Sequence, residues 1–253
     1  MNVEIYERMY LSERDNWWFK GRRELVTEMV ARASNSFEGF GDAALKILDV
    51  GCGTGLNSKA FEQFGDVYSL DISAEALRFC SLRERSRIIR GSADNLPIKD
   101  ESFDLLCALD LLEHVENDLS ALREFHRILK PGGYLVLTVP SFMFLWSDHD
   151  VALHHKRRYD KGILVNSLKL KGFFVNMNTH WNCVLFPGVA LLRMINTLKG
   201  NRVRREDSLE MNQCINNILL YVLRLENFVI KHGFNLPFGV SILCICKKRS
   251  IEN

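Results

Sequence analysis

The stretch LKILDVGCGTG, residues 45–55, is the segment around which the chain is organised. It begins with an apolar run, residues 45–50, which is typical of a buried strand in a parallel sheet. Three glycines follow at alternate positions, and a helical pattern starts at Leu56. Together these features predict a pocket of nucleotide size, because glycine lets the backbone turn sharply and lets a ligand lie against it.

The glycine spacing distinguishes between two kinds of nucleotide site. A dinucleotide site has the pattern G-x-G-x-x-G, whereas this chain has D-V-G-C-G-T-G, with Asp49 before the first glycine. An acid suits a cationic ligand better than a phosphate. The stretch resembles motif I of the class I S-adenosylmethionine-dependent methyltransferases, in the branch that acts on small molecules. The cofactor of that family carries an ammonium, a carboxylate and a sulfonium, and no phosphate.

The resemblance covers roughly residues 45–140, and LREFHRILKPGGYLVLTVP closely resembles the structural motif III. In that motif Lys130-Pro131-Gly132-Gly133 should end a helix before the fifth strand, residues 134–139. It implies an α/β fold: a Rossmann-like, doubly wound, seven-stranded mixed sheet whose last strand enters antiparallel. Helical additions are expected at the N-terminus and between the last two strands. We therefore expect a helical cap over residues 1–40 and a methyltransferase domain over 41–253. The domain would include an acceptor-side loop, 141–160, and a helical insertion, 183–235.

Two downstream acids fit the cofactor motifs. Asp71 ends the second predicted strand, where an acid accepts hydrogen bonds from two ribose hydroxyls. Ser73 is a good candidate to cap the next helix, which leaves Asp71 for the ribose. The resemblance implies that Asp94, in GSADNLP, accepts a hydrogen bond from the adenine amino group. An aspartate at this position also suits a turn.

Other cofactor contacts follow from the resemblance. The end of the predicted strand 103–109 should face the methionine part, and His114 either lies over the adenine or ribose or only packs. Near the N-terminus, Trp18 and Arg22 either cap the ligand or belong to a helix that packs on the sheet. The expected S-adenosylmethionine contacts are Asp49, Gly51, Cys52, Gly53, Gly55, Asp71, Ile72, Asp94, Asn95, Leu109, Asp110, His114, Arg22 and Trp18.

The segment SFMFLWSDHDVALHHKRRY, residues 141–159, follows the fifth predicted strand, beside the transferred methyl. Four interpretations remain open: arginines that bind an anionic acceptor, a histidine base, a metal site, or a solvated lid. We expect no metal, because no recognised ligand spacing is present. The candidate bases are His149 and His154. The candidate acceptor contacts are Asp148, His155, Arg157, Arg158 and Tyr159.

Composition limits the function. The net charge of +2 over 253 residues predicts no nucleic-acid partner. Seven cysteines lie mostly in apolar runs without a C-x-x-C pair, which indicates reduced core residues of a cytoplasmic protein. The first residues lack the apolar core of a signal peptide, and no apolar run reaches the roughly 18 residues of a membrane span.

Two apolar helical stretches, near 183–198 and 215–229, flank a basic segment at 199–205, and Pro187, Gly188 and Arg193 are expected to interrupt the first of them. They would shape the acceptor site, cover the sheet, or lie on an acidic lipid surface, which would make the protein membrane-associated. The function expected is methyl transfer to a small molecule, with hints of an anionic, lipid-like or lipid-linked acceptor. An NAD(P)-dependent oxidoreductase and a non-catalytic cofactor-binding partner protein are the alternatives. The sequence does not indicate an oligomeric state.

Overall fold

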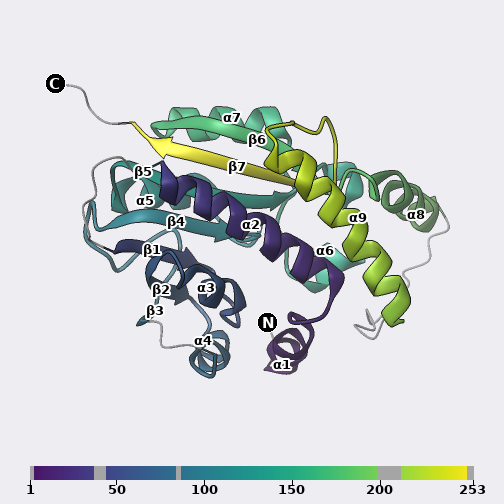
Figure 1. Cartoon of the computed structure of the whole chain (residues 1–253), viewed down its shortest axis with the longest axis horizontal. Coiled ribbons are helices and arrows are strands. Elements are labelled where there is room, and N and C mark those ends of the chain that lie inside the picture. The colour runs from purple at the N-terminus through teal and green to yellow at the C-terminus, as the bar shows by residue number, and fades with distance from the viewer. Residues whose placement is uncertain (1–2, 37–43, 84–86, 199–211, 250–253) are drawn as a thin grey trace.

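The computed structural model describes residues 3–36, 44–83, 87–198 and 212–249. A seven-stranded sheet with the order β3-β2-β1-β4-β5-β7-β6 lies between two layers of helices (Figure 1). The strands are β1 Leu45–Val50, β2 Gly65–Asp71, β3 Arg87–Arg90, β4 Phe103–Leu109, β5 Leu129–Pro140, β6 Phe173–Trp181 and β7 Ser241–Lys248. The helices are α1 Val3–Ser12, α2 Trp17–Asn35, α3 Leu56–Phe61, α4 Ala74–Ser81, α5 Asp118–Ile128, the 3₁₀ helix η1 Met143–Leu145, α6 Asp148–Ala152, α7 Lys161–Leu170, α8 Phe186–Leu198 and α9 Gln213–Lys231.

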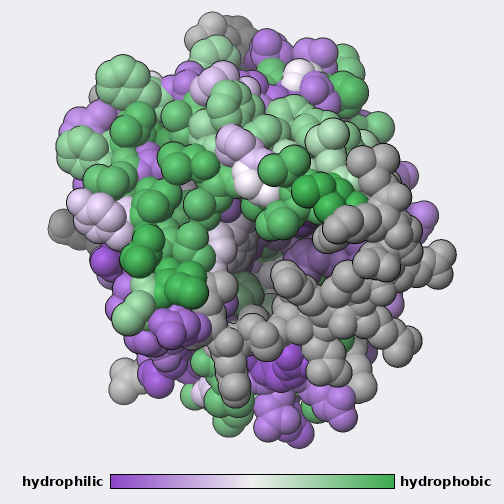
Figure 2. Space-filling model, turned by 90° about the vertical axis from the view of Figure 1, so that its right-hand side faces the viewer, coloured by the Kyte–Doolittle hydropathy of each residue, from purple (hydrophilic) through white to green (hydrophobic). Residues whose placement is uncertain are grey.

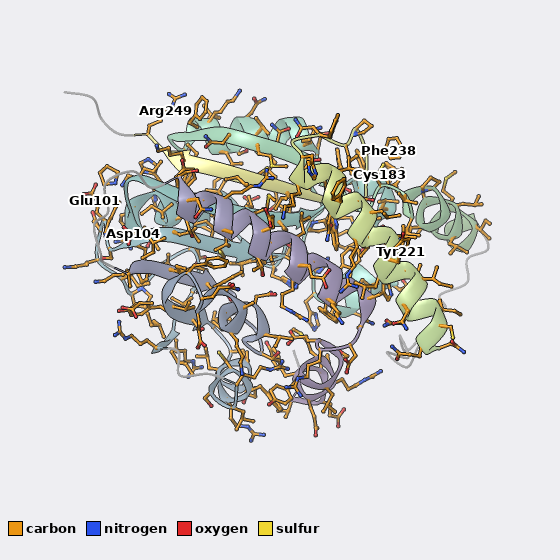
Figure 3. The ribbon with its side chains drawn as sticks, viewed as in Figure 1. Glu101, Asp104, Cys183, Tyr221, Phe238 and Arg249 are labelled. Carbon is orange, nitrogen blue, oxygen red and sulfur yellow. The ribbon has the colours of Figure 1, made fainter. Side chains whose placement is uncertain are left out.

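The predicted sheet is confirmed. β7 pairs antiparallel with both β5 and β6, while the pairs from β3 across to β5 are all parallel. The carboxyl ends of β1, β2, β4 and β5 therefore meet at one edge of the sheet. Figure 3 shows Cys183 and Phe238 near that edge and Glu101 and Asp104 at the opposite end.

Two apolar layers hold the sheet. One face packs on α5 and α7, and the other on α2, α3 and α9. Because both faces are covered, β4 is buried along its whole length. Five of the seven cysteines are buried as expected, whereas Cys183 is half-buried and Cys214 is exposed on α9.

The predicted N-terminal helix is confirmed as α2, whose apolar face enters the core through Leu25, Val26, Met29 and Val30. α9 lies along α2 (Figure 1). The amide of Asn227 donates to the carbonyl of Gly21 at 2.9 Å. A Cβ on Gly21 would lie 2.7 Å from Leu223 Cδ1, so glycine allows this close approach. α1 lies before α2, within the region 1–40 expected to be a helical cap, although no pattern in residues 3–12 was singled out as a helix.

β5 begins earlier than predicted. We expected Lys130-Pro131-Gly132-Gly133 to precede the strand, but the strand starts at Leu129, which pairs with Phe103. The next pair is Leu105 with Tyr134, so the Pro-Gly-Gly segment forms an irregularity inside the strand. Gly132 has φ of +77°, a conformation that glycine adopts without strain.

α8 is continuous through residues that we expected to interrupt it. Pro187 and Gly188 lie in its first turn, where a missing amide donor costs no helical hydrogen bond. The basic segment 199–205 lies outside the described residues. Among the helices of residues 3–36, 44–83, 87–198 and 212–249, none combines the length and the hydropathy needed to cross a bilayer.

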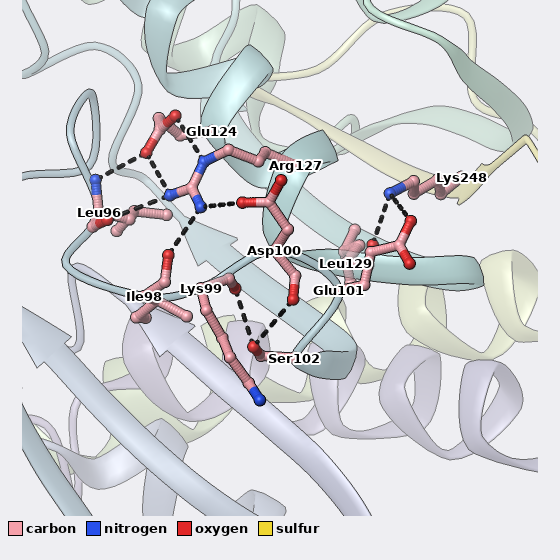
Figure 4. Close-up of polar contacts among 10 residues, drawn as sticks. All are labelled: Leu96, Ile98, Lys99, Asp100, Glu101, Ser102, Glu124, Arg127, Leu129 and Lys248. Atoms are coloured by element: carbon pink, nitrogen blue, oxygen red, sulfur yellow. Dashed lines mark hydrogen bonds and ion pairs between the residues drawn. The ribbon is translucent and has the colours of Figure 1, made fainter.

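Arg127 on α5 holds the loop that leads into β4 in place through hydrogen bonds (Figure 4). Its guanidinium donates to the carboxylates of Glu124 and Asp100 and to the carbonyls of Leu96 and Ile98, at 2.7 to 3.1 Å. The hydrogen bonds that Arg127 donates to Glu124 and Asp100 hold its pKa above the usual value despite partial burial. Figure 4 also shows Lys248 of β7 bonded to the Leu129 carbonyl.

Candidate active site

The glycine loop after β1 has a conformation that only glycine adopts freely. Gly51, Gly53 and Gly55 have φ of +72°, +55° and +83°. The amide of Gly51 donates to the Leu70 carbonyl at 2.7 Å, which fixes the loop against β2. A Cβ on Gly55 would lie 2.6 Å from the sulfur of Cys80. The loop therefore presents bare backbone where a side chain would otherwise stand.

Asp49 lies under this loop and is 2% exposed. It accepts a hydrogen bond from the Ser58 hydroxyl at 2.5 Å. Burial raises the pKa of Asp49 to about 7, although the Ser58 hydrogen bond and the positive charge of Arg22 oppose the shift. A cationic group at the loop would favour the ionised form of this carboxyl and lower its raised pKa.

Asp71 lies at the end of β2 and orients the loop as well. Its carboxylate accepts from the amide of Gly53 at 3.0 Å and from the amide of Ser73 at 2.9 Å. Ser73 caps α4 as predicted, because its hydroxyl accepts from the amide of Ala76. Asp71 is thus bound to protein, its remaining lone pairs stay available for further donors, and its role at the ribose stays a prediction.

The segment containing Asp94 comes alongside Asp71. The amide of Gly91 donates to the Asp71 carbonyl at 3.1 Å. Asp94 is half-buried and accepts from the Ser92 hydroxyl, and Asn95 beside it is exposed. Ile72 is 65% exposed, which leaves an apolar side chain next to these acids. A nucleoside would meet both polar and apolar groups here.

Arg22 reaches the end of β4, where it forms an ion pair with Asp110. Asp110 also accepts from the Thr138 hydroxyl at 2.9 Å and has φ of +51°, an uncommon value for aspartate. Leu109 beside it is buried. Trp18 packs on Trp181 with ring centroids 4.8 Å apart. The arginine therefore already has a protein partner, and its role as a cap over the cofactor stays a prediction.

α1 brings residues to the glycine loop that the sequence did not single out. The Met9 methyl lies 3.4 Å from where a Cβ of Gly53 would stand. Glu13 is buried and accepts a hydrogen bond from the Thr54 hydroxyl. No local pattern marks Glu13, since its partner lies 41 residues away in the sequence.

The acceptor-side segment, expected as a loop, contains η1 and α6, and Asp150 is its structural centre. This aspartate is fully buried. It accepts from Arg158 Nε at 2.8 Å, pairs with His155 Nδ1 at 2.9 Å, and accepts from the backbone amide of Ser147, the N-cap residue of α6, at 2.9 Å. Burial raises the pKa of Asp150, but the His155 hydrogen bond and the charge of Arg158 outweigh it and hold the pKa below its usual value.

The other predicted acceptor residues lie around this centre. Arg157 forms an ion pair with Asp118 at 3.0 Å, and the Tyr159 hydroxyl donates to the same carboxylate at 2.9 Å. These contacts fix the segment to the start of α5. Asp148 and the two candidate bases, His149 and His154, are exposed. Their assigned roles stay predictions.

The structure joins two histidines to a buried acid that the sequence analysis did not select. Ligand atoms of Glu113, His114 and His155 all lie within 4.8 Å of one another. The amide of Lys156 donates to the Glu113 carbonyl at 2.7 Å, which brings the two segments together. Burial, together with the charge of His155, lowers the pKa of His114 to about 4. His114 is thus a neutral ligand or acceptor group at ordinary pH.

Comparison with known proteins identifies relatives of the central part of the chain. Residues 48–137 match the family model described as "Methyltransferase domain". An uncharacterised protein of Methanocaldococcus jannaschii is 35% identical over 150 residues, covering 58% of this chain and 64% of its own length. The demethylmenaquinone methyltransferase of Staphylococcus epidermidis is 38% identical over 116 residues, covering 40% of this chain and 48% of its own.

The chain thus aligns with less than two thirds of the length of these two relatives. Similarity to solved structures extends further. An S-adenosylmethionine-dependent methyltransferase from Thermotoga maritima superposes with a TM-score of 0.58, covering 98% of this chain and 96% of its own, at 17% identity. This likeness shows that nearly the whole described chain has one fold.

Proposed function

We propose that this chain, which belongs to the class I S-adenosylmethionine-dependent methyltransferases, transfers a methyl group to a small-molecule acceptor. One observation carries the proposal. Asp49, Asp71 and Asp94 follow or end successive strands around a glycine loop with positive φ angles. That set offers carboxylates to an ammonium, a ribose and an adenine amino group, and it offers no positive charge to a pyrophosphate.

The chain's own residues bind and orient the reactants. In this proposal Asp71 holds the ribose hydroxyls, Asp94 holds the adenine, and Asp49 with the loop backbone holds the amino-acid end. S-adenosylmethionine supplies an activated methyl on a sulfonium, with a neutral leaving group. The protein has mainly to align the acceptor and exclude water. A base is needed only where the acceptor must lose a proton.

An apolar face beside the acceptor-side segment supports a lipid-like acceptor. The rings of Phe142, Phe144, Phe186 and Phe238 lie in a chain of contacts, with centroids 5.2 to 6.2 Å apart. On α8, Leu191 and Leu192 are 59% and 60% exposed. Figure 2 shows hydrophobic residues gathered on this face beside a hollow. The demethylmenaquinone of the Staphylococcus relative is an acceptor of this kind.

The first experiment is calorimetric titration of S-adenosylhomocysteine into wild type, Asp71→Ala and Asp66→Ala. Removing Asp71 should cost about 1–3 kcal/mol, or roughly ten- to a hundred-fold in affinity. Asp66, exposed in the same strand, is the control and should leave affinity unchanged. Absence of binding to wild type, or equal binding to Asp71→Ala, would contradict the proposed register of the cofactor.

Two further measurements separate the alternatives. Tight NADH binding without S-adenosylhomocysteine binding would favour an oxidoreductase. Transfer of radiolabelled methyl to any acceptor, tested across isoprenoid quinols and water-soluble phenols, would exclude a non-catalytic binding protein.

The same apolar face is proposed to make peripheral contact with membranes. Co-sedimentation with phosphatidylglycerol vesicles should be weakened when Leu191 and Leu192 are both changed to Gln. Leu170→Gln is the matched control, because Leu170 is 85% exposed at the end of α7. Equal sedimentation of all three proteins would contradict membrane contact through this face.

A further inference from the structure

Glu113 is a buried acid that faces the segment after α6. It lies in the turn after β4 and its side chain is 0% exposed. Within the part of the chain that the structure describes, neither carboxylate oxygen has a hydrogen-bond partner. Buried carboxylates are normally paired, hydrogen-bonded or bound to a metal, because the desolvated charge is otherwise costly. Both oxygens of Glu113 therefore call for a ligand that carries positive charge or donates protons.

Two imidazoles face the same point. The ring centroids of His114 and His155 are 4.7 Å apart in an edge-to-face arrangement. One ligand atom from each ring and one from Glu113 lie within 4.8 Å of one another. An ion held by all three would draw these atoms slightly closer, since metal–nitrogen and metal–oxygen distances of about 2 Å place neighbouring ligand atoms roughly 3–4 Å apart.

His155 is oriented as a metal ligand would be. Its Nδ1 lies 2.9 Å from a carboxylate oxygen of Asp150. Because a carboxylate only accepts, Nδ1 carries a proton, and in the neutral imidazole Nε2 then offers its lone pair to a metal. Arg158 in turn holds Asp150, through Nε at 2.8 Å. A ligating histidine that donates its other nitrogen to a held carboxylate is the usual outer arrangement of a metal site.

We propose that Glu113, His114 and His155 form a binding site for a divalent first-row transition-metal ion such as Zn²⁺. Two imidazoles and one carboxylate suit Zn²⁺, Fe²⁺ or Mn²⁺ better than Ca²⁺, which prefers oxygen ligands throughout. This site was not expected from the sequence, because Glu113 and His114 lie far along the chain from His155. The two segments are joined by the hydrogen bond from the Lys156 amide to the Glu113 carbonyl and by the contacts that Arg157 makes with the carbonyls of Val115 and Glu116.

Three protein ligands leave a coordination position open. That position would take an oxygen of the acceptor and favour its deprotonated form, so the acceptor would carry a hydroxyl. This consequence rests on the proposed function, whereas metal binding does not. The two are separable, because Zn²⁺ binding and S-adenosylhomocysteine binding are measured independently.

The test is calorimetric titration of Zn²⁺ into full-length protein freed of metal with a chelator. Wild type should bind one Zn²⁺ per chain. Glu113→Gln and His155→Gln should each weaken this binding by at least about a hundredfold, since each removes a ligand. His232→Gln removes an exposed histidine at the end of α9 and should leave the binding unchanged.

A second readout covers variants that fold poorly. Zn²⁺ should raise the thermal midpoint of wild type and of His232→Gln, but not of Glu113→Gln. Co²⁺ should give visible d–d absorption in wild type that is lost in His155→Gln. The proposal is overturned if wild type binds no Zn²⁺, or if Glu113→Gln binds Zn²⁺ as tightly as wild type.

Discussion

Glu13, in the turn between α1 and α2, is buried against Thr54 of the glycine loop and accepts a hydrogen bond from the Thr54 hydroxyl. Arg83 lies 3.3 Å from the same carboxylate. Burial raises the pKa of Glu13, while the Thr54 hydrogen bond and Arg83 oppose the shift. The N-terminal segment is thereby coupled to the loop that we assign to the cofactor.

Thr54→Val should destabilise the protein, because the buried Glu13 carboxyl loses its hydroxyl donor and keeps only the Arg83 contact. We expect a loss of about 1–3 kcal/mol in the free energy of unfolding, measured with urea. In a Glu13→Gln background the same change should cost less. Equal costs in both backgrounds would show that the two residues do not interact.

Asp49 should make stability fall as pH rises. Its folded pKa of about 7 exceeds the ordinary value of 3.8, so the folded protein keeps a proton that the unfolded chain releases. The free energy of unfolding should therefore fall between about pH 4 and pH 7, by up to about 4 kcal/mol, and level off above. Asp49→Asn should remove this decline. Parallel pH curves for wild type and variant, measured by urea unfolding without cofactor, would refute the assignment.

Gly55→Ala should be more harmful than Gly233→Ala. Both glycines have positive φ, +83° and +89°, so alanine is strained by about 1 kcal/mol at either position. At Gly55 the new Cβ would also lie 2.6 Å from Cys80 Sγ and 3.2 Å from its Cα, whereas at Gly233 it would meet nothing within 4 Å. Thermal unfolding should show a larger loss for Gly55→Ala. Similar losses would mean that Cys80 moves aside freely.

Arg127→Lys should destabilise the protein although the charge is kept. A lysine ammonium cannot replace the planar guanidinium, which donates hydrogen bonds to Glu124, Asp100 and two carbonyls at once. We expect a loss of about 1–3 kcal/mol in urea unfolding. Arg123→Lys, at an exposed position on the same helix, is the control and should be nearly neutral. If the two variants unfold alike, the network contributes little.

Much of the fold was predictable because its signals are local. The apolar run of β1, the glycine turn after it and the amphipathic face of α2 each lie within a few residues of sequence. Short-range sterics and burial determine such elements. The boundaries of β5 were less predictable, because Pro131 and the glycines after it suit a turn and a strand irregularity equally well.

The sequence by itself determined the order of the strands' apolar runs, the glycine loop and the acids beside it, because each depends on neighbouring residues. Only the tertiary structure decided how distant side chains meet. It paired Arg158 and His155 with Asp150, and it placed His155 against Glu113. The contact between His155 and Glu113 depends on how the segment after α6 lies against the turn after β4. The attraction and hydrogen bonds between these opposite charges must offset the cost of burying them, and no periodicity in the sequence records such a pairing.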